Sequence, residues 1–209
     1  MTSINGHVFS DCSSLTSVKI PSSVTSIDSE AFSGCSNLAS VEIPSSVTSI
    51  DYGAFSGCSS LASVNMPSVT SIGSSAFENC SNLASVDMPS VTSIDSRTFK
   101  ACSRLASVDM PSVTSIGSSA FEDCSRLTSV DMPSVMSIGN SAFYCCYSLS
   151  SVNMPSVTSI GSSAFSNCSR LASVEIPSSV TSIADGVFSG CIYNHRTTKT
   201  NQKYPSVNL

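Results

Sequence analysis

The stretch LASVDMPSVTSI fills Leu83–Ile94 and returns unchanged at Leu105–Ile116, and close variants of it recur along the chain. Phe residues mark the same repeat, with successive steps of 22 or 23 residues: Phe9, Phe32, Phe55, Phe77, Phe99, Phe121, Phe143, Phe165 and Phe188. A fixed period of 20–50 residues is typical of a solenoid or a propeller. A propeller blade needs about 40 residues and four strands. The shorter period therefore favours a solenoid.

Each repeat begins with a short strand pattern. In LASVEIP, Val41 and Ile43 are apolar and alternate with polar residues, which indicates a strand with one buried face. Pro44 ends this strand because it has no N–H to donate to a neighbour. SVTSI follows and predicts a second short extended segment.

The rest of each repeat carries small residues around an Ala-Phe pair, as in DSEAFSGC at 28–35. Asp28 can cap a single helical turn and Gly34 can end it. Each coil then has eight inward positions: Leu, Val, Ile or Met, Val, Ile, Ala, Phe and Cys. One coil cannot bury these side chains alone, whereas stacked coils can. A plain β-helix would not need a helical turn in every coil.

The predicted fold class is therefore an α/β solenoid of the leucine-rich repeat type, a right-handed superhelix of about eight coils of 22–23 residues. Short parallel strands are expected on the concave face, and a short strand plus a helical turn on the outer side. We predict a solenoid domain over 1–191 that begins partway through a coil without an N-terminal cap. A polar basic tail, expected to be frayed, follows over 192–209.

The repeat unit resembles the BspA-like, or Treponema-type, class of leucine-rich repeats over about residues 1–191. Its Ile-Pro and Ala-Phe-x-x-Cys elements carry the resemblance. Members of that family are typically surface or secreted proteins of microbes that engage host or matrix proteins. The resemblance therefore implies a cell-surface protein active in adhesion or recognition.

Composition excludes several other classes. The chain has 209 residues, of which 41% are hydrophobic and 11% charged, so a disordered chain is not expected. The net charge of −5 argues against binding to nucleic acid. No apolar run approaches the ~18 residues of a membrane helix, and MTSINGHVFSDC shows no signal-peptide pattern. The compartment stays open. The uncapped first coil predicts end-to-end self-association or additional sequence.

The ten cysteines suggest disulfides or a metal site at first sight. Nine of them recur once per coil, three residues after each Phe, so stacking would spread them along the axis. A zinc site needs four ligands that converge on one point. We expect reduced thiols buried in the core, with disulfides and metal as alternatives, and an exposed Cys145, which is out of register.

No catalytic, cofactor-binding or metal-ligating residue is predicted, because His7 and His195 are the only histidines and no acid/base grouping can be assembled.

The strand residues that point outward offer the candidate surface. Between the inward Val and the Ile or Met of successive coils lie Lys19, Glu42, Asn65, Asp87, Asp109, Asp131, Asn153 and Glu175. The last seven form the candidate protein-binding stripe on the concave face, and a solvated acidic face is the simpler alternative. Such a stripe favours a basic protein partner or a cation. We therefore predict a non-enzymatic recognition module, with an intracellular interaction scaffold as the alternative function. Glu78, Lys100 and Glu122 share another register and should alternate in sign between coils.

Overall fold

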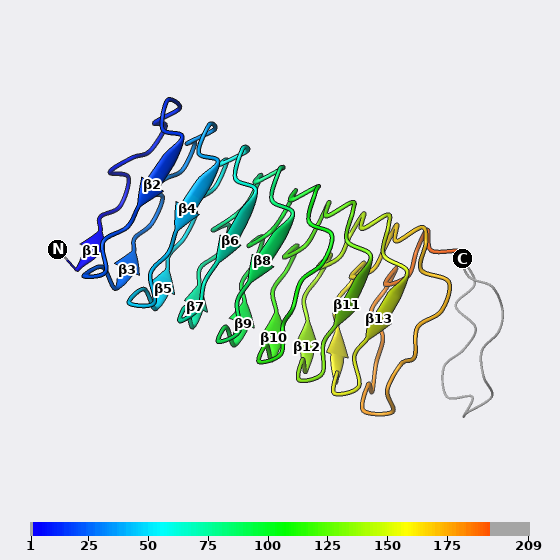
Figure 1. Cartoon of the computed structure of the whole chain (residues 1–209). Coiled ribbons are helices and arrows are strands. Elements are labelled where there is room, and N and C mark those ends of the chain that lie inside the picture. The colour runs from blue at the N-terminus through cyan, green and yellow to red at the C-terminus, as the bar shows by residue number, and fades with distance from the viewer. Residues whose placement is uncertain (1, 193–209) are drawn as a thin grey trace.

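The chain winds into a solenoid whose coils follow one another along a single axis (Figure 1). The structure is a computed structural model that describes residues 2–192. It is a parallel-strand solenoid of about seven turns of ~22 residues. The expectation of a strand-built solenoid is confirmed, while the count of about eight coils and the right-handed sense stay predictions. Apart from Ile192, the predicted tail lies outside the described residues.

Each coil contributes up to two very short strands. The first strand of a coil has three residues, and its copies are β2 (Ser17–Lys19), β4 (Ser40–Glu42), β6 (Ser63–Asn65), β8 (Ser85–Asp87), β11 (Ser129–Asp131) and β13 (Ser151–Asn153). The second has two residues, and its copies are β1 (Ser3–Ile4), β3 (Ser26–Ile27), β5 (Ser49–Ile50), β7 (Ser71–Ile72), β9 (Ser93–Ile94), β10 (Ser115–Ile116), β12 (Ser137–Ile138) and β14 (Ser159–Ile160).

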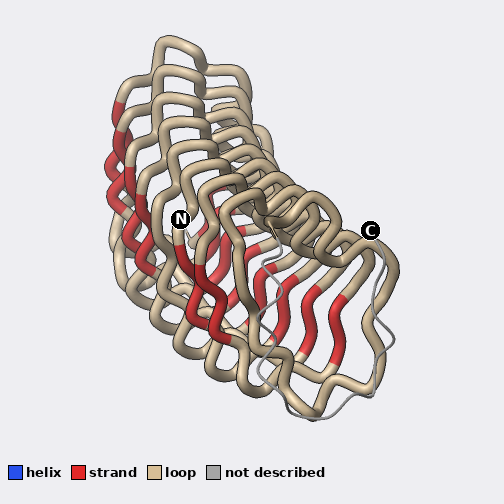
Figure 2. Tube along the Cα trace, turned by 90° about the vertical axis from the view of Figure 1, so that its right-hand side faces the viewer, coloured by secondary structure: helices blue, strands red, loops and turns tan. Residues whose placement is uncertain are grey.

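All strand pairs are parallel and join residues one repeat apart. The two-residue strands form two four-stranded sheets, β1-β3-β5-β7 and β9-β10-β12-β14. The three-residue strands pair as β2-β4, β6-β8 and β11-β13. Figure 2 shows the two rows of strands on different sides of the coil, with turns on the remaining side. We call the side with the three-residue strands the strand face and the side with the Ala-Phe segments the turn face.

The predicted helical turn is wrong for the described residues, which contain no helix. The Ala-Phe segment is a series of turns in which neighbouring N–H groups point in different directions. Phe32 N donates to Ala54 O of the next coil at 2.8 Å, whereas Ala31 N donates to the carbonyl three residues earlier at 3.2 Å. Glu30 lies in the left-handed region at φ 56°, which a right-handed helix does not allow. Every second N–H is thus used to join coils rather than to build a helix.

The eight inward positions predicted from the repeat form one continuous core. In the coil that starts at Leu83, the buried side chains include Val86, Met88, Val91 and Ile94. The core runs from Ile4 to Cys191 without a break. Three coils depart from Ala at the position before Phe: Val8 and Val187 stand there near the two ends of the described chain, and Thr98 stands there in the middle.

Thr98 is fully buried, and its hydroxyl donates to Asp95 O at 2.9 Å. This bond satisfies a polar group that burial would otherwise penalise.

The Phe side chains form a stack along the axis of the solenoid. Ring centroids of successive Phe residues are 5.1–5.6 Å apart and the ring planes lie 2–16° from parallel. The seven rings from Phe32 to Phe165 are completely buried. This spacing is slightly larger than the ~4.8 Å between paired strands. The stack confirms the inward position of Phe.

Replacing Phe99 with Ala should lower the free energy of unfolding by about 3–5 kcal/mol, because the neighbouring rings cannot close the cavity. Urea unfolding followed by circular dichroism measures this change. Tyr52→Ala is the matched control, because the Tyr52 ring is 54% exposed and its loss should cost less than about 1 kcal/mol. Equal losses in the two variants would contradict the stacked core.

Candidate protein-recognition surface

The outward residues of the strand face form one column along the solenoid. This acidic column consists of Lys19, Glu42, Asn65, Asp87, Asp109, Asp131, Asn153 and Glu175, all of them exposed. Pairing of the three-residue strands sets Asn65 beside Asp87 and Asp131 beside Asn153, and a bridge sets Asp109 beside Asp131. The structure therefore brings the predicted stripe together. Its position on a concave face stays a prediction.

Neighbouring carboxylates in this column carry an electrostatic cost. Asp109 and Asp131 belong to adjacent coils, and two like charges ~5 Å apart repel by roughly 0.8 kcal/mol in water. Asn153 relieves part of this cost, since its Nδ2 donates to Asp131 Oδ1 at 2.7 Å. A cationic group of a partner would relieve more. The column can thus accept basic side chains.

A second column lies at the corner where the turn face meets the strand face, and the sequence reasoning missed it. The corner column holds the residues two positions after each core Cys: Ser14, Asn37, Ser60, Asn82, Arg104, Arg126, Ser148 and Arg170. All except the half-buried Ser60 and Ser148 are exposed. Arg104 Nη1 donates to Asn82 Oδ1 of the preceding coil at 3.1 Å. The sequence did contain a sign of this column, because three Arg residues occur at the same position of their repeats.

The turn face carries a partly buried ion pair. Lys100 Nζ lies 3.0 Å from Glu122 Oε1, in the register where the sequence predicted charges of alternating sign. Partial burial acts to raise the pKa of Glu122, but hydrogen bonds from Ser119 and Lys100 outweigh it and hold that pKa below its ordinary value. This pair joins two adjacent coils. Its charges are satisfied within the chain, so it offers less to a partner than the acidic column.

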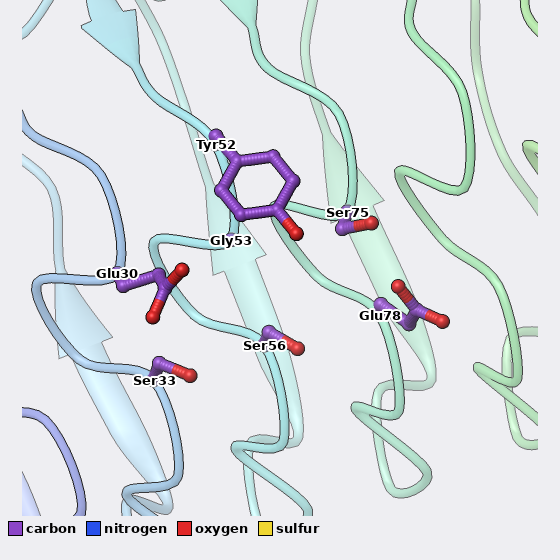
Figure 3. Close-up of a pocket in the computed structure, with 7 residues that line it drawn as sticks. All are labelled: Glu30, Ser33, Tyr52, Gly53, Ser56, Ser75 and Glu78. Carbon is purple, nitrogen blue, oxygen red and sulfur yellow. The ribbon is translucent and has the colours of Figure 1, made fainter.

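A shallow depression of about 180 Å³ also lies on the turn face (Figure 3). Its lining comes from three successive coils: Glu30, Ser33, Tyr52, Gly53, Ser56, Ser75 and Glu78. Figure 3 shows Glu30 and Glu78 on opposite sides of the Tyr52 ring. Glu30 also lies 3.4 Å from His7 Nδ1. The carboxylates of this polar lining can accept hydrogen bonds from a small donor group.

Cysteines form a second buried stack beside the Phe rings. From Cys35 to Cys191, each in-register thiol donates to the carbonyl of Phe in the preceding coil at 3.0–3.2 Å. Burial raises the pKa of these thiols, to about 12 for Cys58 and well above the ordinary value for Cys102. All ten cysteines are free. Within residues 2–192 no three His, Cys, Asp or Glu side chains are grouped to hold a metal ion.

Two expectations about individual thiols were wrong. Cys12, expected to be shielded, is exposed, because it lies in the first described coil and no described coil covers it. Cys145, expected to be exposed, is only 6% exposed. It occupies a left-handed turn position (φ 59°), and Asn167 Nδ2 of the next coil lies 3.7 Å from its Sγ. The neighbouring coil thus covers it.

The profile of the BspA type leucine rich repeat region matches this chain in six copies, over residues 2–113 and 92–204. The chain belongs to the BspA-type leucine-rich repeat family. Leucine-rich repeat proteins are generally protein-interaction modules and generally not enzymes. The acidic column and the corner column are the exposed charged columns of the strand face in this BspA-type solenoid.

Solved structures of other leucine-rich repeat proteins resemble this BspA-type chain. The T. pallidum leucine-rich repeat protein TpLRR is 32% identical with a TM-score of 0.57, over 82% of this chain and 72% of TpLRR. A leucine-rich repeat protein from Eubacterium ventriosum is 29% identical with a TM-score of 0.51, over 93% of this chain and 45% of that protein. The pneumococcal vaccine antigen PcpA, 19% identical with a TM-score of 0.53 over 86% and 57%, shares the fold. No curated protein matches significantly.

Residues 2–192 contain no helix, and hence no helix long and apolar enough to cross a membrane.

Thiol labelling should separate Cys12 from the other nine cysteines. A maleimide reagent should modify Cys12 of the native protein within minutes, while the buried thiols react only after denaturant is added. Intact-mass spectrometry counts the labels. Cys12→Ser should remove the fast label without changing the slow ones. Rapid modification of several thiols in native protein would contradict the buried stack.

The buried thiols should also make the BspA-type solenoid sensitive to alkali. An unfolded thiol has a pKa near 8.5, and burial raises the pKa of Cys80 well above the ordinary value of 9.0. The folded chain therefore keeps protons that the unfolded chain releases. The free energy of unfolding should be insensitive to these thiols below pH ~8 and should fall above pH ~9, by up to about 1.4 kcal/mol per pH unit for each thiol.

Urea unfolding from pH 7 to pH 10.5 measures this slope. Cys80→Ala should reduce the alkaline slope by about one thiol's share, whereas the exposed Cys12→Ala should leave it unchanged. A slope that does not respond to Cys80→Ala would contradict the effect of burial.

Proposed function

We propose that this chain is a non-enzymatic recognition module that binds other proteins through the strand face. Its contact surface is centred on Asp87, Asp109 and Asp131. Asn65 and Asn153 flank this centre. Glu42 and Glu175 extend it, and a protein with a basic surface is the expected partner. Adhesion to a host or matrix protein is the role we favour.

The observation that carries this proposal is the row of exposed carboxylates held in register by the coils. Because the solenoid fixes the strand backbone, the spacing of these side chains is set before any partner arrives. Preorganised groups lose little conformational entropy on binding. Like charges set in a row also attract a basic partner over longer distances than one carboxylate, and salt weakens this attraction.

The resemblance to the BspA-like family implies a role outside the cell, because members of that family are typically surface or secreted proteins. One observation favours the alternative, an intracellular interaction scaffold: all ten cysteines are free. Free thiols are the usual state in reducing compartments, whereas secreted proteins commonly form disulfides. A binding experiment with both kinds of partner separates the two functions.

Charge reversal of the column centre should abolish partner binding. The parent and an Asp87/Asp109/Asp131→Lys variant are immobilised and exposed to purified matrix proteins and to cell lysate. We expect the parent to retain a basic protein at low salt, with binding that weakens at least tenfold toward ~0.5 M salt. The triple variant should lose this binding.

Asp51/Asp95/Asp185→Lys is the matched control, because it changes the net charge equally at exposed residues outside the acidic column. Capture of matrix proteins by the parent and the control supports adhesion, and capture of cytosolic proteins alone supports the scaffold. Binding retained by the column variant would place the contact surface elsewhere.

A further inference from the structure

The corner column and the acidic column vary together from coil to coil. Five coils carry an acid in the acidic column, and in each the corner residue five positions earlier is Asn or Arg: Asn37 with Glu42, Asn82 with Asp87, Arg104 with Asp109, Arg126 with Asp131 and Arg170 with Glu175. The three coils without an acid have Ser at the corner: Ser14 with Lys19, Ser60 with Asn65 and Ser148 with Asn153. Arg therefore occurs only in coils that also hold a carboxylate.

Contacts within one chain do not explain this matching. The two positions of a coil are five residues apart, up to ~16 Å along an extended backbone, and salt screens charges beyond ~8–10 Å. The ion pairs between described residues, His7–Glu30 and Lys100–Glu122, lie on the turn face. Arg104 instead contacts Asn82 of its own column. The corner residues and the acids of the same coils thus vary together, although no ion pair joins the two columns in the described part of the chain.

We propose that a second copy of this chain docks on the strand face, so that the corner column of each copy meets the acidic column of the other. A two-fold axis parallel to the solenoid axis keeps equivalent coils of the two copies level and reverses the strand direction. Arg104, Arg126 and Arg170 of one copy then face the acids of the same coils in the other. The interface is self-complementary, as a symmetric dimer requires.

The alternative two-fold axis, parallel to the strands, fails on charge. It would set the corner column against the corner column and the acidic column against the acidic column. Like charges facing each other across an interface oppose association. The charge pattern thus selects the parallel arrangement of the two solenoids.

The surface between the columns permits a close approach. The exposed side chains there are small, and they form two rows. The first row is Thr16, Ala39, Ala62, Ala84, Ala106, Thr128, Ser150 and Ala172, and the second is the Ser residue that follows each of these. Seven coils at 5.1–5.6 Å each and a width of up to ~16 Å give at most about 600 Å² per copy. This area lies at the lower end for specific interfaces. The dimer should therefore be weak, concentration-dependent and sensitive to salt.

This inference rests on the proposed function in one respect: it takes the strand face as an interaction surface and names a second copy as a partner. It differs from end-to-end association, in which the coils at the two ends would meet. A side-by-side dimer is shorter and thicker than an end-to-end dimer. Small-angle X-ray scattering distinguishes the two shapes.

A charge-swap experiment tests the dimer by sedimentation velocity in ~20 mM salt. The corner variant is Arg104/Arg126/Arg170→Glu, and the acidic variant is Asp109/Asp131/Glu175→Arg. In the corner variant both columns are acidic, and in the acidic variant both are basic, so each alone should raise the dimer Kd at least tenfold. Mixed one to one, the two variants should form a heterodimer, because every facing pair is then of opposite charge.

Further measurements guard against trivial outcomes. Circular dichroism and thermal melts should show that both variants keep the parent fold, as expected for exposed positions. Arg104/Arg126/Arg170→Gln removes the charges without reversing them. This variant should form a weaker dimer than the parent, and mixing it with the acidic variant should restore association less than mixing in the corner variant does. Raising the salt to ~0.5 M should dissociate the parent dimer and the heterodimer.

Three results would overturn the dimer: a parent that stays monomeric at high concentration in low salt, single variants that associate as well as the parent, or a mixture that does not associate. An elongated end-to-end shape in scattering would do the same. If the dimer fails while the parent still captures a basic partner, the proposed function stands without this inference. If capture fails while the mixture forms a heterodimer, the reverse holds.

Discussion

Stacking of one coil on the next is the interaction on which the whole structure depends. A single coil has strands of two or three residues and no interior of its own, so it cannot bury its eight inward side chains. Backbone hydrogen bonds such as Phe32 N to Ala54 O join neighbouring coils, and the Phe and Cys stacks fill the space between them. Each coil therefore supplies half of its neighbour's core, and stability accumulates along the axis.

The repeat made the core predictable, because a position that recurs every 22 or 23 residues must lie in the same place in every coil. Alternation around Val41 and Ile43 predicted the strand, and the steps between Phe residues predicted the ring stack. The turn segment was not predictable in the same way. The left-handed position of Glu30 is filled by Gly in some coils, as at Gly53 and Gly186, but by residues such as Ser75 and Arg97 in others. The sequence therefore carries no consistent sign that the backbone leaves the helical region there.

The candidate surface was predicted only in part for a related reason. The acidic column belongs to a strand, where alternation shows which residues point outward. The corner column belongs to a turn, where alternation gives no direction, so Arg104, Arg126 and Arg170 were not connected with the acids. The exposure of Cys12 and of Cys145 could not be predicted from the sequence either. Their exposure depends on what the adjacent coil places over them, and the local sequence does not contain that information.

The serial arrangement of coils has a mechanical consequence. When tension is applied at the two ends of a solenoid, every junction between coils carries the same force, and the junctions are nearly identical in structure. The row of three-residue strands is interrupted between β4 and β6 and again between β8 and β11, where an isolated bridge joins Asp109 to Asp131. Releasing one coil of 22 residues adds up to ~75 Å of extended chain. Under tension the chain can therefore lengthen one coil at a time, in steps of this size.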